Sequence, residues 1–315
     1  MGQGLVRRGG TGSISHSFPN PTYILKDTLG ATYSSISDGY ASLIVSSTNP
    51  DTPPSGELTF FSKIRANKVI PSVIGPSGVD FNIQGSLYGN TIIRWVPGVT
   101  TTVSIAWGTT WTARNSSGAQ SHPAKSSANA LSSLNRALFA TTATANTSAG
   151  IQSTQVVAWR GNAVGLGGFF FFARFGMSVI GSLTGVRVLI GLSVLNGTLT
   201  VDPSTINNTV AIIKDAADTT WQFLTRNTST LTKIDTASTV TVNQVLDIYI
   251  HVKPNDGSAT FHLKDAVTGI DIYQQTLTTG MIDGTTFMYI HCQVQTTTTA
   301  VSSLSLGQMY LESDV

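Results

Sequence analysis

Histidine side chains are considered first, because they bind metals and carry out acid–base catalysis. Five histidines occur in the chain. His251 and His262 fall on the same outer face of a predicted hairpin, but a metal site needs a third ligand and a hydrogen-bonded partner behind the ligands. Neither is evident at a suitable spacing, so we expect a solvated polar face. The sequence predicts no metal and no other cofactor.

Carboxylates are the second group that could do chemistry. Glycoside hydrolysis needs two of them about 5 to 10 Å apart. The two glutamates, Glu57 and Glu312, are distant in sequence, and no motif pairs the aspartates. Those considered are Asp80, Asp202, Asp247 and Asp271. A Gly-x-Ser-x-Gly turn and a phosphate-binding glycine loop with lysine are both missing from the sequence. We therefore expect a protein that is not an enzyme.

Tryptophans offer a third kind of chemistry, stacking against sugar rings. The usual role of so large an aromatic side chain is to fill a core or a subunit interface. Both alternatives stay open for the five tryptophans, and the sequence singles out none of them as a sugar platform. They are Trp95, Trp107, Trp111, Trp159 and Trp221.

The composition indicates the fold that must position these groups. Only 11% of the residues are charged, against roughly 25% in an average soluble protein. Hydrophobic residues make up 41%, and Thr and Ser dominate the polar remainder. Thr, Val, Ile and aromatic residues favour pleated sheets, while the strong helix formers Glu and Lys are scarce. We predict an all-β protein, an antiparallel β-sandwich or jelly roll with a small N-terminal β region and a flexible arm.

Charge and cysteine content narrow the class of partner. The net charge is +2, and the sequence has no basic stripe of the kind that binds nucleic acid. No apolar run approaches the length of a membrane span, and residues 1–20 lack the apolar segment of a signal peptide. A lone cysteine, Cys292, excludes an intramolecular disulfide. We therefore expect synthesis in a bacterial cytoplasm, with no nucleic-acid partner and no membrane insertion.

The clearest local pattern is a hairpin in the C-terminal half. Residues 245–253 and 258–264 flank the turn sequence Pro-Asn-Asp-Gly, which sets His251 opposite Thr260 and Tyr249 opposite His262. One face is then wholly apolar and the other wholly polar or aromatic, which indicates a hairpin with one buried face. The apolar set is Ile248, Ile250, Val252, Ala259, Phe261 and Leu263. By the same alternation Cys292 should be buried, and Gly307 should form a β-bulge.

Other segments define the organisation of the chain. The Gly-rich residues 1–20 resemble an arm, and the Pro-rich stretch 46–56 places a domain boundary that gives units of 1–54 and 55–315. Leucine spacing predicts one short helix over residues 123–139. Four consecutive phenylalanines, Phe169, Phe170, Phe171 and Phe172, must point to both faces of a strand. One pair fills a core, and the other needs a second layer, which is either a neighbouring sheet or another subunit. Our hypothesis is that the run forms a subunit interface.

Two motifs resemble a known group of proteins. The run Ser-Gly-Glu-Leu-Thr-Phe-Phe-Ser-Lys at residues 55–63, followed by Gly-Pro-Ser-Gly-Val-Asp at 75–80, resembles a segment of tailed-bacteriophage structural proteins. Gly-Leu-Gly-Gly-Phe-Phe-Phe at 165–171, with Arg-Phe-Gly at 174–176, strengthens the resemblance. It covers roughly residues 55–315. These proteins are known as tail fibres, head fibres or minor virion proteins.

The resemblance implies a β-rich virion appendage that assembles as a homotrimer and possesses a distal part able to touch the host surface. We place its docking to other virion proteins in the N-terminal arm, at Gly2, Leu5, Arg7 and Arg8. Two alternatives remain. One is a capsid head fibre or decoration protein. The other is a module that recognises a host-surface glycan, or a polysaccharide depolymerase on the same scaffold.

Overall fold

The computed structural model describes the backbone of residues 6–8, 11–13, 23–26, 32–37, 40–43, 50–55, 57–75, 80–82, 91–98 and 105–313. Side chains are described in 50–55, 57–67, 69–75, 91–98 and 108–313. The chain forms two compact units, Met1–Gly85 and Ser86–Val315. The sequence placed the boundary after residue 54. The units divide later because the strands that follow residue 57 form a sheet of their own.

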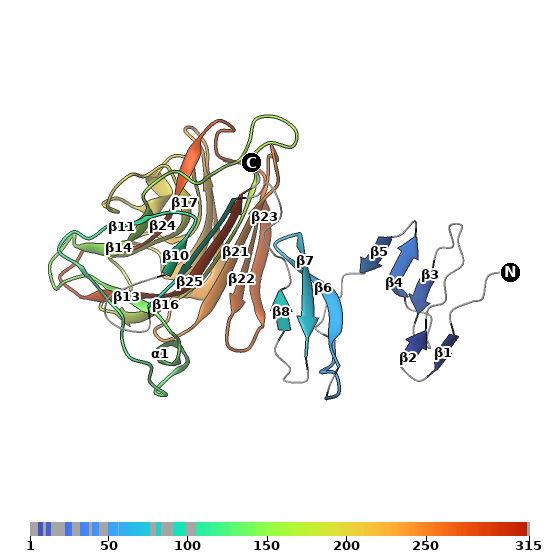
Figure 1. The fold of residues 1–315 in the computed structure, drawn as a ribbon. Coiled ribbons are helices and arrows are strands. Elements are labelled where there is room, and N and C mark those ends of the chain that lie inside the picture. The colour runs from blue at the N-terminus through green and yellow to red at the C-terminus, as the bar shows by residue number, and fades with distance from the viewer. Residues whose placement is uncertain are drawn as a thin grey trace. The chain divides into compact units, whose positions relative to one another are not determined.

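The first unit contains small antiparallel sheets (Figure 1). The strands are β1 (Val6–Arg8) with β2 (Thr11–Ser13); β3 (Tyr23–Lys26), β4 (Thr32–Ser37) and β5 (Tyr40–Leu43); and β6 (Thr59–Arg65), β7 (Lys68–Ile74) and β8 (Asp80–Asn82). Strand β6 begins within the motif at residues 55–63. Its two-residue turn to β7 takes left-handed φ values at Ala66 and Asn67, the turn geometry that matches strand twist.

The second unit is a sandwich of two antiparallel sheets, which confirms the predicted fold class. The nine-stranded sheet contains β9 (Thr91–Val96), β10 (Ile105–Trp107), β12 (Ala119–Ser121), β13 (Ala137–Ala140), β16 (Phe169–Ile180), β21 (Leu246–Val252), β22 (Ala259–Asp265), β23 (Asp271–Leu277) and β25 (Ser302–Ser313). The eight-stranded sheet contains β11 (Trp111–Ala113), β14 (Ser148–Ser153), β15 (Ala158–Trp159), β17 (Val186–Ser193), β18 (Thr209–Lys214), β19 (Thr220–Arg226), β20 (Leu231–Thr239) and β24 (Phe287–Thr296). Side chains of both sheets share one hydrophobic core.

The predicted hairpin is confirmed as β21 and β22, with His251 opposite Thr260 and Tyr249 opposite His262. All six residues of its predicted apolar face are buried in the core between the sheets. Cys292 is buried as predicted, and burial raises the pKa of its thiol far above the usual value. The alternation of apolar and polar residues was sufficient to predict the buried face here, because one face of each strand packs against the other sheet.

Strand β25 occupies a central position in the nine-stranded sheet. It pairs with β16 along one side and with β9 and β13 along the other. The pairing with β16 shifts register between Arg174 and Phe175, where Gly307 has no partner. This confirms the predicted bulge, and it explains how buried residues on either side of Gly307 have opposite parity. Those residues are Leu304 and Leu306, then Met309 and Leu311.

The helix predicted over residues 123–139 is wrong. The helix α1 spans only Ala130–Ser133, capped by Asn129, whose Oδ1 accepts a hydrogen bond from Ser132 N at 2.8 Å. Leu138 lies instead in β13, between β12 and β25. Sheet hydrogen bonds on both sides of β13 outweigh the helical preference of so short a segment.

Residues 194–208, here called the cover loop, pack on the outer side of the eight-stranded sheet. They include the 3₁₀ turn η1 (Pro203–Thr205). Leu199 and Ile206 of the loop form a second hydrophobic cluster with residues of β17, β18 and β19 that point away from the main core. The strand residues are Leu189, Ala211, Ile213 and Leu224. These middle strands are therefore apolar on both faces, which explains their nearly continuous hydrophobic sequence.

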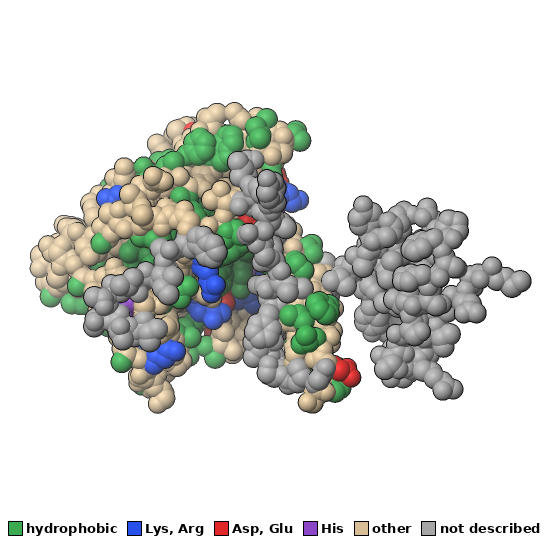
Figure 2. All heavy atoms as spheres, viewed as in Figure 1, with side chains coloured by type: hydrophobic (Ala, Val, Ile, Leu, Met, Phe, Trp, Pro, Cys, Tyr) green, Lys and Arg blue, Asp and Glu red, His purple; other side chains and the backbone are tan. Residues whose placement is uncertain are grey.

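The surface of the described residues reflects the composition. Figure 2 shows mostly uncharged atoms on the visible face of the sandwich, with isolated patches of Lys, Arg, Asp and Glu. Within the described residues, neither helix has the length or apolar character needed to cross a membrane.

Candidate functional site

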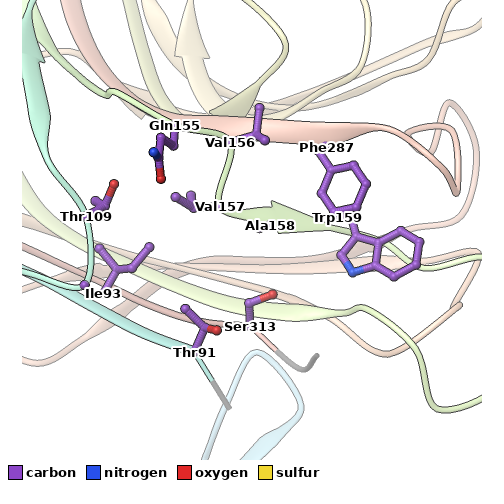
Figure 3. A pocket seen from close by; sticks show the side chains of 11 residues that line it. Thr91, Ile93, Thr109, Gln155, Val156, Val157, Ala158, Trp159, Phe287 and Ser313 are labelled. Carbon is purple, nitrogen blue, oxygen red and sulfur yellow. The ribbon is translucent and has the colours of Figure 1, made fainter. Parts of the chain in front are cut away.

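A pocket of about 420 Å³ opens on the second unit. The start of β9, the turn after β10, the segment leading into β15, the start of β24 and the end of β25 contribute to its walls (Figure 3). Its described lining residues are Thr91, Ile93, Gly108, Thr109, Gln155, Val156, Val157, Ala158, Trp159, Phe287 and Ser313. None of these side chains carries a charge. Pockets of this size commonly hold small ligands.

Two aromatic rings stand at one end of this pocket. Trp159 of β15 pairs directly with Phe287 of β24. Their ring centroids are 5.0 Å apart and their planes differ by 14°, which is a stacked arrangement. Phe287 is 50% exposed and Trp159 is half-buried. The pair, here called the aromatic platform, therefore offers ring surface to solvent beside the pocket (Figure 3).

Backbone contacts on both sides fix the platform. Val157 N donates to Met288 O at 2.8 Å, and Gly168 N donates to Trp159 O at 3.0 Å. Gly168 has a φ of +85°, and a Cβ there would lie 2.6 Å from Pro254 N. Only glycine permits this approach of the loop to the β21–β22 turn. Gly168 thus serves the packing of this loop against the turn.

None of the other tryptophans with described side chains lines the pocket. Trp95 and Trp221 are each 1% exposed and belong to the core. Trp111 is partly buried and meets Trp95 edge-on, with centroids 6.5 Å apart. The side chain of Trp107 lies outside the described residues. Among the tryptophans whose side chains are described, Trp159 is the one that lines the pocket and stacks on a half-exposed ring.

The predicted solvated histidine face is wrong for His262. This side chain is buried, and its Nε2 lies 2.8 Å from Asp271 Oδ1. Lys264 Nζ also lies 2.8 Å from the same carboxylate oxygen. Among the described residues, no three His, Cys, Asp or Glu side chains gather in a metal-binding cluster. A polar face of a strand is not always exposed to solvent, because neighbouring side chains can cover it.

Three of the four aspartates considered in the sequence form ion pairs. Asp247 binds Arg174, and Asp202 binds Arg187, each at 2.7 Å. Partial burial opposes ionisation of Asp271, but its hydrogen bond from Lys264 and the neighbouring His262 keep the pKa of this carboxyl below its usual range. The lowered pKa values of Asp202 and Asp271 make these two carboxyls unsuited to general acid catalysis. The two glutamates belong to different units, and the side chain of Asp80 lies outside the described residues.

The phenylalanine run points to both faces of β16, as predicted. Phe169 and Phe171 enter the core between the sheets. On the other face, Phe170 is only 5% exposed, while Phe172 is half-buried against Tyr249, with ring centroids 5.0 Å apart. Three of the four rings are thus buried in the single chain. A subunit interface at this run stays a prediction, and Phe172 has the most surface to give to it.

The predicted docking residues are only partly described. Arg7 and Arg8 lie in β1, paired with β2, and their side chains lie outside the described residues. Gly2 and Leu5 also lie outside them. The aromatic platform itself was not predicted, because Trp159 and Phe287 are distant in sequence and only strand pairing brings them together.

Comparisons with known proteins show the fold and no family. No family model matches the chain, and no curated protein matches it. A protein of unknown function from Shewanella oneidensis MR-1 matches with a TM-score of 0.50 at 12% identity, covering 72% of this chain and 87% of that one. Peanut lectin with a bound 9-mer peptide matches with a TM-score of 0.48 at 7% identity, over 71% and 97%. Arcelin-5, a lectin-like defence protein of Phaseolus vulgaris, reaches 0.47 at 9% identity, over 71% and 98%. These proteins resemble the chain in fold alone, which is an antiparallel sandwich of two sheets.

Proposed function

We propose that this protein binds a glycan at the aromatic platform and the adjoining pocket. The observation that carries the proposal is the stacked pair Trp159 and Phe287, with ring surface exposed beside a cavity. The C–H face of a sugar ring is apolar and fits flat against an aromatic ring, while its hydroxyl groups need hydrogen-bond partners. Side-chain oxygens of Thr91, Thr109 and Gln155 line the same pocket and can supply them.

The proposal is one of binding without turnover. Hydrolysis of a glycan would need a carboxyl group at the ligand, and the described lining of the pocket has none. This supports the glycan-binding alternative over the depolymerase. A glycan-binding module would also suit the predicted virion appendage, whose attachment to a particle stays a prediction.

A glycan array probed with the purified chain tests the proposal. We expect a defined set of glycans to bind, and we expect Trp159→Ala and Phe287→Ala each to abolish or strongly weaken that binding. Trp159→Phe, which keeps a flat ring, should retain part of it. Leu231→Ala removes a similarly exposed hydrophobic side chain outside the pocket and serves as the control. Circular dichroism should show that all four variants are folded.

Two results would overturn the proposal. One is an array on which the wild-type chain binds nothing. The other is binding that survives both alanine variants. Release of reducing ends from a bound polysaccharide would instead favour the depolymerase, and would show that a catalytic group outside the described lining reaches the pocket.

A further inference from the structure

The pocket next to the aromatic platform is lined by both aliphatic and polar side chains. Val156, which is 42% exposed, and Val157 give it an aliphatic wall, whereas Ile93 and Ala158 line it with only 1% of their surface exposed. Thr91, Thr109, Gln155 and Ser313 provide hydroxyl and amide groups. In Figure 3, Val157 is drawn near the centre of the lining side chains, with Trp159 and Phe287 at one end. A ligand on the platform that extends into the pocket therefore meets aliphatic carbon as well as polar groups.

The aliphatic wall would favour some substituents of a bound sugar over others. A hydroxyl group pressed against Val157 would lose its water without gaining a hydrogen bond, which weakens binding. A methyl group in the same place gains by leaving water, by a factor of about four in affinity for each buried carbon. A carboxylate would be the least favourable occupant, since the described lining offers no cation to pair with it.

From these contacts, and resting on the proposed function, we infer that the ligand is a neutral sugar that bears a methyl group. The methyl group is that of a 6-deoxy sugar or of an acetyl substituent, and it lies against the aliphatic wall while the ring stacks on the platform. The polar groups of the pocket bind the remaining hydroxyls. Such a site rejects uronic acids and sialic acids.

Pairs of sugars that differ in one group test the inference on the wild-type chain. L-fucose is compared with L-galactose, and L-rhamnose with L-mannose, to probe the deoxy methyl group. N-acetylglucosamine is compared with glucose to probe the acetyl group, and glucuronic acid with glucose to probe charge. Affinities are measured by calorimetry or by ligand-observed NMR. We expect at least one methyl-bearing member to bind about fourfold or more tightly than its partner, glucuronic acid to bind most weakly, and no marked salt dependence.

A variant ties the preference to the wall. Val157→Thr has nearly the same shape but replaces one methyl by a hydroxyl, so it should reduce the ratio within the preferred pair towards one. Val201→Thr makes the same change at an exposed position outside the pocket and should leave the ratio unchanged. Thermal melts show whether either variant is folded.

The outcomes separate the two proposals. Equal or tighter binding of the hydroxylated or acidic partners, with Trp159→Ala still abolishing binding, overturns the inference and leaves the glycan site standing. A ratio that Val157→Thr does not change also overturns it. If no glycan binds at all, both proposals fail. If Val157→Thr does not fold, the affinities of the wild-type chain for the sugar pairs still test the inferred preference.

Discussion

Arg174 holds Asp247 through two hydrogen bonds across neighbouring strands, Nε to Oδ1 and Nη2 to Oδ2, both 2.7 Å long. The Asp247 side chain is only 7% exposed, while that of Arg174 is 32% exposed. The hydrogen bond to Asp247 raises the pKa of Arg174 above its usual value. The pair connects β16 to β21 at the bulge opposite Gly307, where the pairing of β16 with β25 is irregular.

Removing one partner of this ion pair should destabilise the sandwich. Asp247→Ala leaves a partly buried guanidinium without its carboxylate, and we expect the free energy of unfolding to fall by roughly 2 kcal/mol. Urea unfolding of Asp247→Ala, Arg174→Met and the double variant forms a double-mutant cycle. We expect the double variant to be less destabilised than the sum of the singles. Simple additivity would mean that the pair contributes nothing.

His291 should make the protein sensitive to acid. Gln293 fixes this ring in its neutral form: its Oε1 accepts from Leu199 N at 2.8 Å, and its Nε2 donates to Gly197 O and lies 2.9 Å from His291 Nδ1. Nδ1 must then accept, so it carries no proton. Burial lowers the pKa of His291 from 6.5 to about 3.

Between these pH values the unfolded state binds one more proton at this site than the folded state. The free energy of unfolding should therefore fall as the pH drops below 6.5, by roughly 1.4 kcal/mol per pH unit. Denaturant unfolding from pH 7 to pH 4 measures this slope, and His291→Gln should reduce it by that amount. The comparison is between slopes, because the substitution also changes stability at neutral pH. An unchanged slope in His291→Gln would refute the prediction.

Gly150 should tolerate no side chain. A Cβ at this position would lie 2.4 Å from Cys292 O and 2.6 Å from Gln293 Cα on the neighbouring strand. Gly150→Ala must push β14 away from β24, and we expect a loss of roughly 3 kcal/mol or more. Gly257→Ala is the matched control, because nothing lies within 4 Å of its added Cβ. Thermal melts should show a much lower Tm for Gly150→Ala only; equal Tm values would contradict the geometry.

The predicted homotrimer is tested by mass in solution. Size-exclusion chromatography with light scattering should give about three times 33.2 kDa. If the phenylalanine run contributes to the interface, Phe172→Ser should reduce this mass, because Phe172 is the most exposed of the four rings. Leu231→Ser, at an exposed position on β20, should leave it unchanged. If the wild-type chain has the mass of a monomer in solution, the prediction of a homotrimer is wrong.

Much of the sandwich could be predicted from sequence, because strand alternation reports directly which side meets a second layer. The β21–β22 register, the burial of Cys292 and the bulge at Gly307 all followed from parity. The prediction of a helix over residues 123–139 was wrong because the spacing of leucines does not show whether the backbone will instead form hydrogen bonds with neighbouring strands. Leu138 satisfies the helical pattern and the sheet equally, and the sheet offered hydrogen bonds on both sides.

The candidate site could be predicted only as a set of alternatives. Trp159 was one of five tryptophans, and nothing local distinguishes it from Trp95 or Trp221. What distinguishes it is Phe287, which reaches it through pairing of β15 with β24. Such a contact depends on the tertiary arrangement. Docking through Gly2, Leu5, Arg7 and Arg8, and attachment to a virion, remain predictions from sequence.

The position of β25 has a consequence for how the protein is made. In the nine-stranded sheet, β25 separates two groups of strands: β9 and β13 on one side, and β16, β21, β22 and β23 on the other. Among the described residues, the two groups have no direct hydrogen-bonded connection. During synthesis they therefore stay unconnected until residues 302–313 are added between them. A nascent chain stalled before Ser302 would hold two unjoined half-sheets with bare edges. Completion of this sheet must therefore await the emergence of residues 302–313 from the ribosome, and until then the unpaired strand edges are open to aggregation.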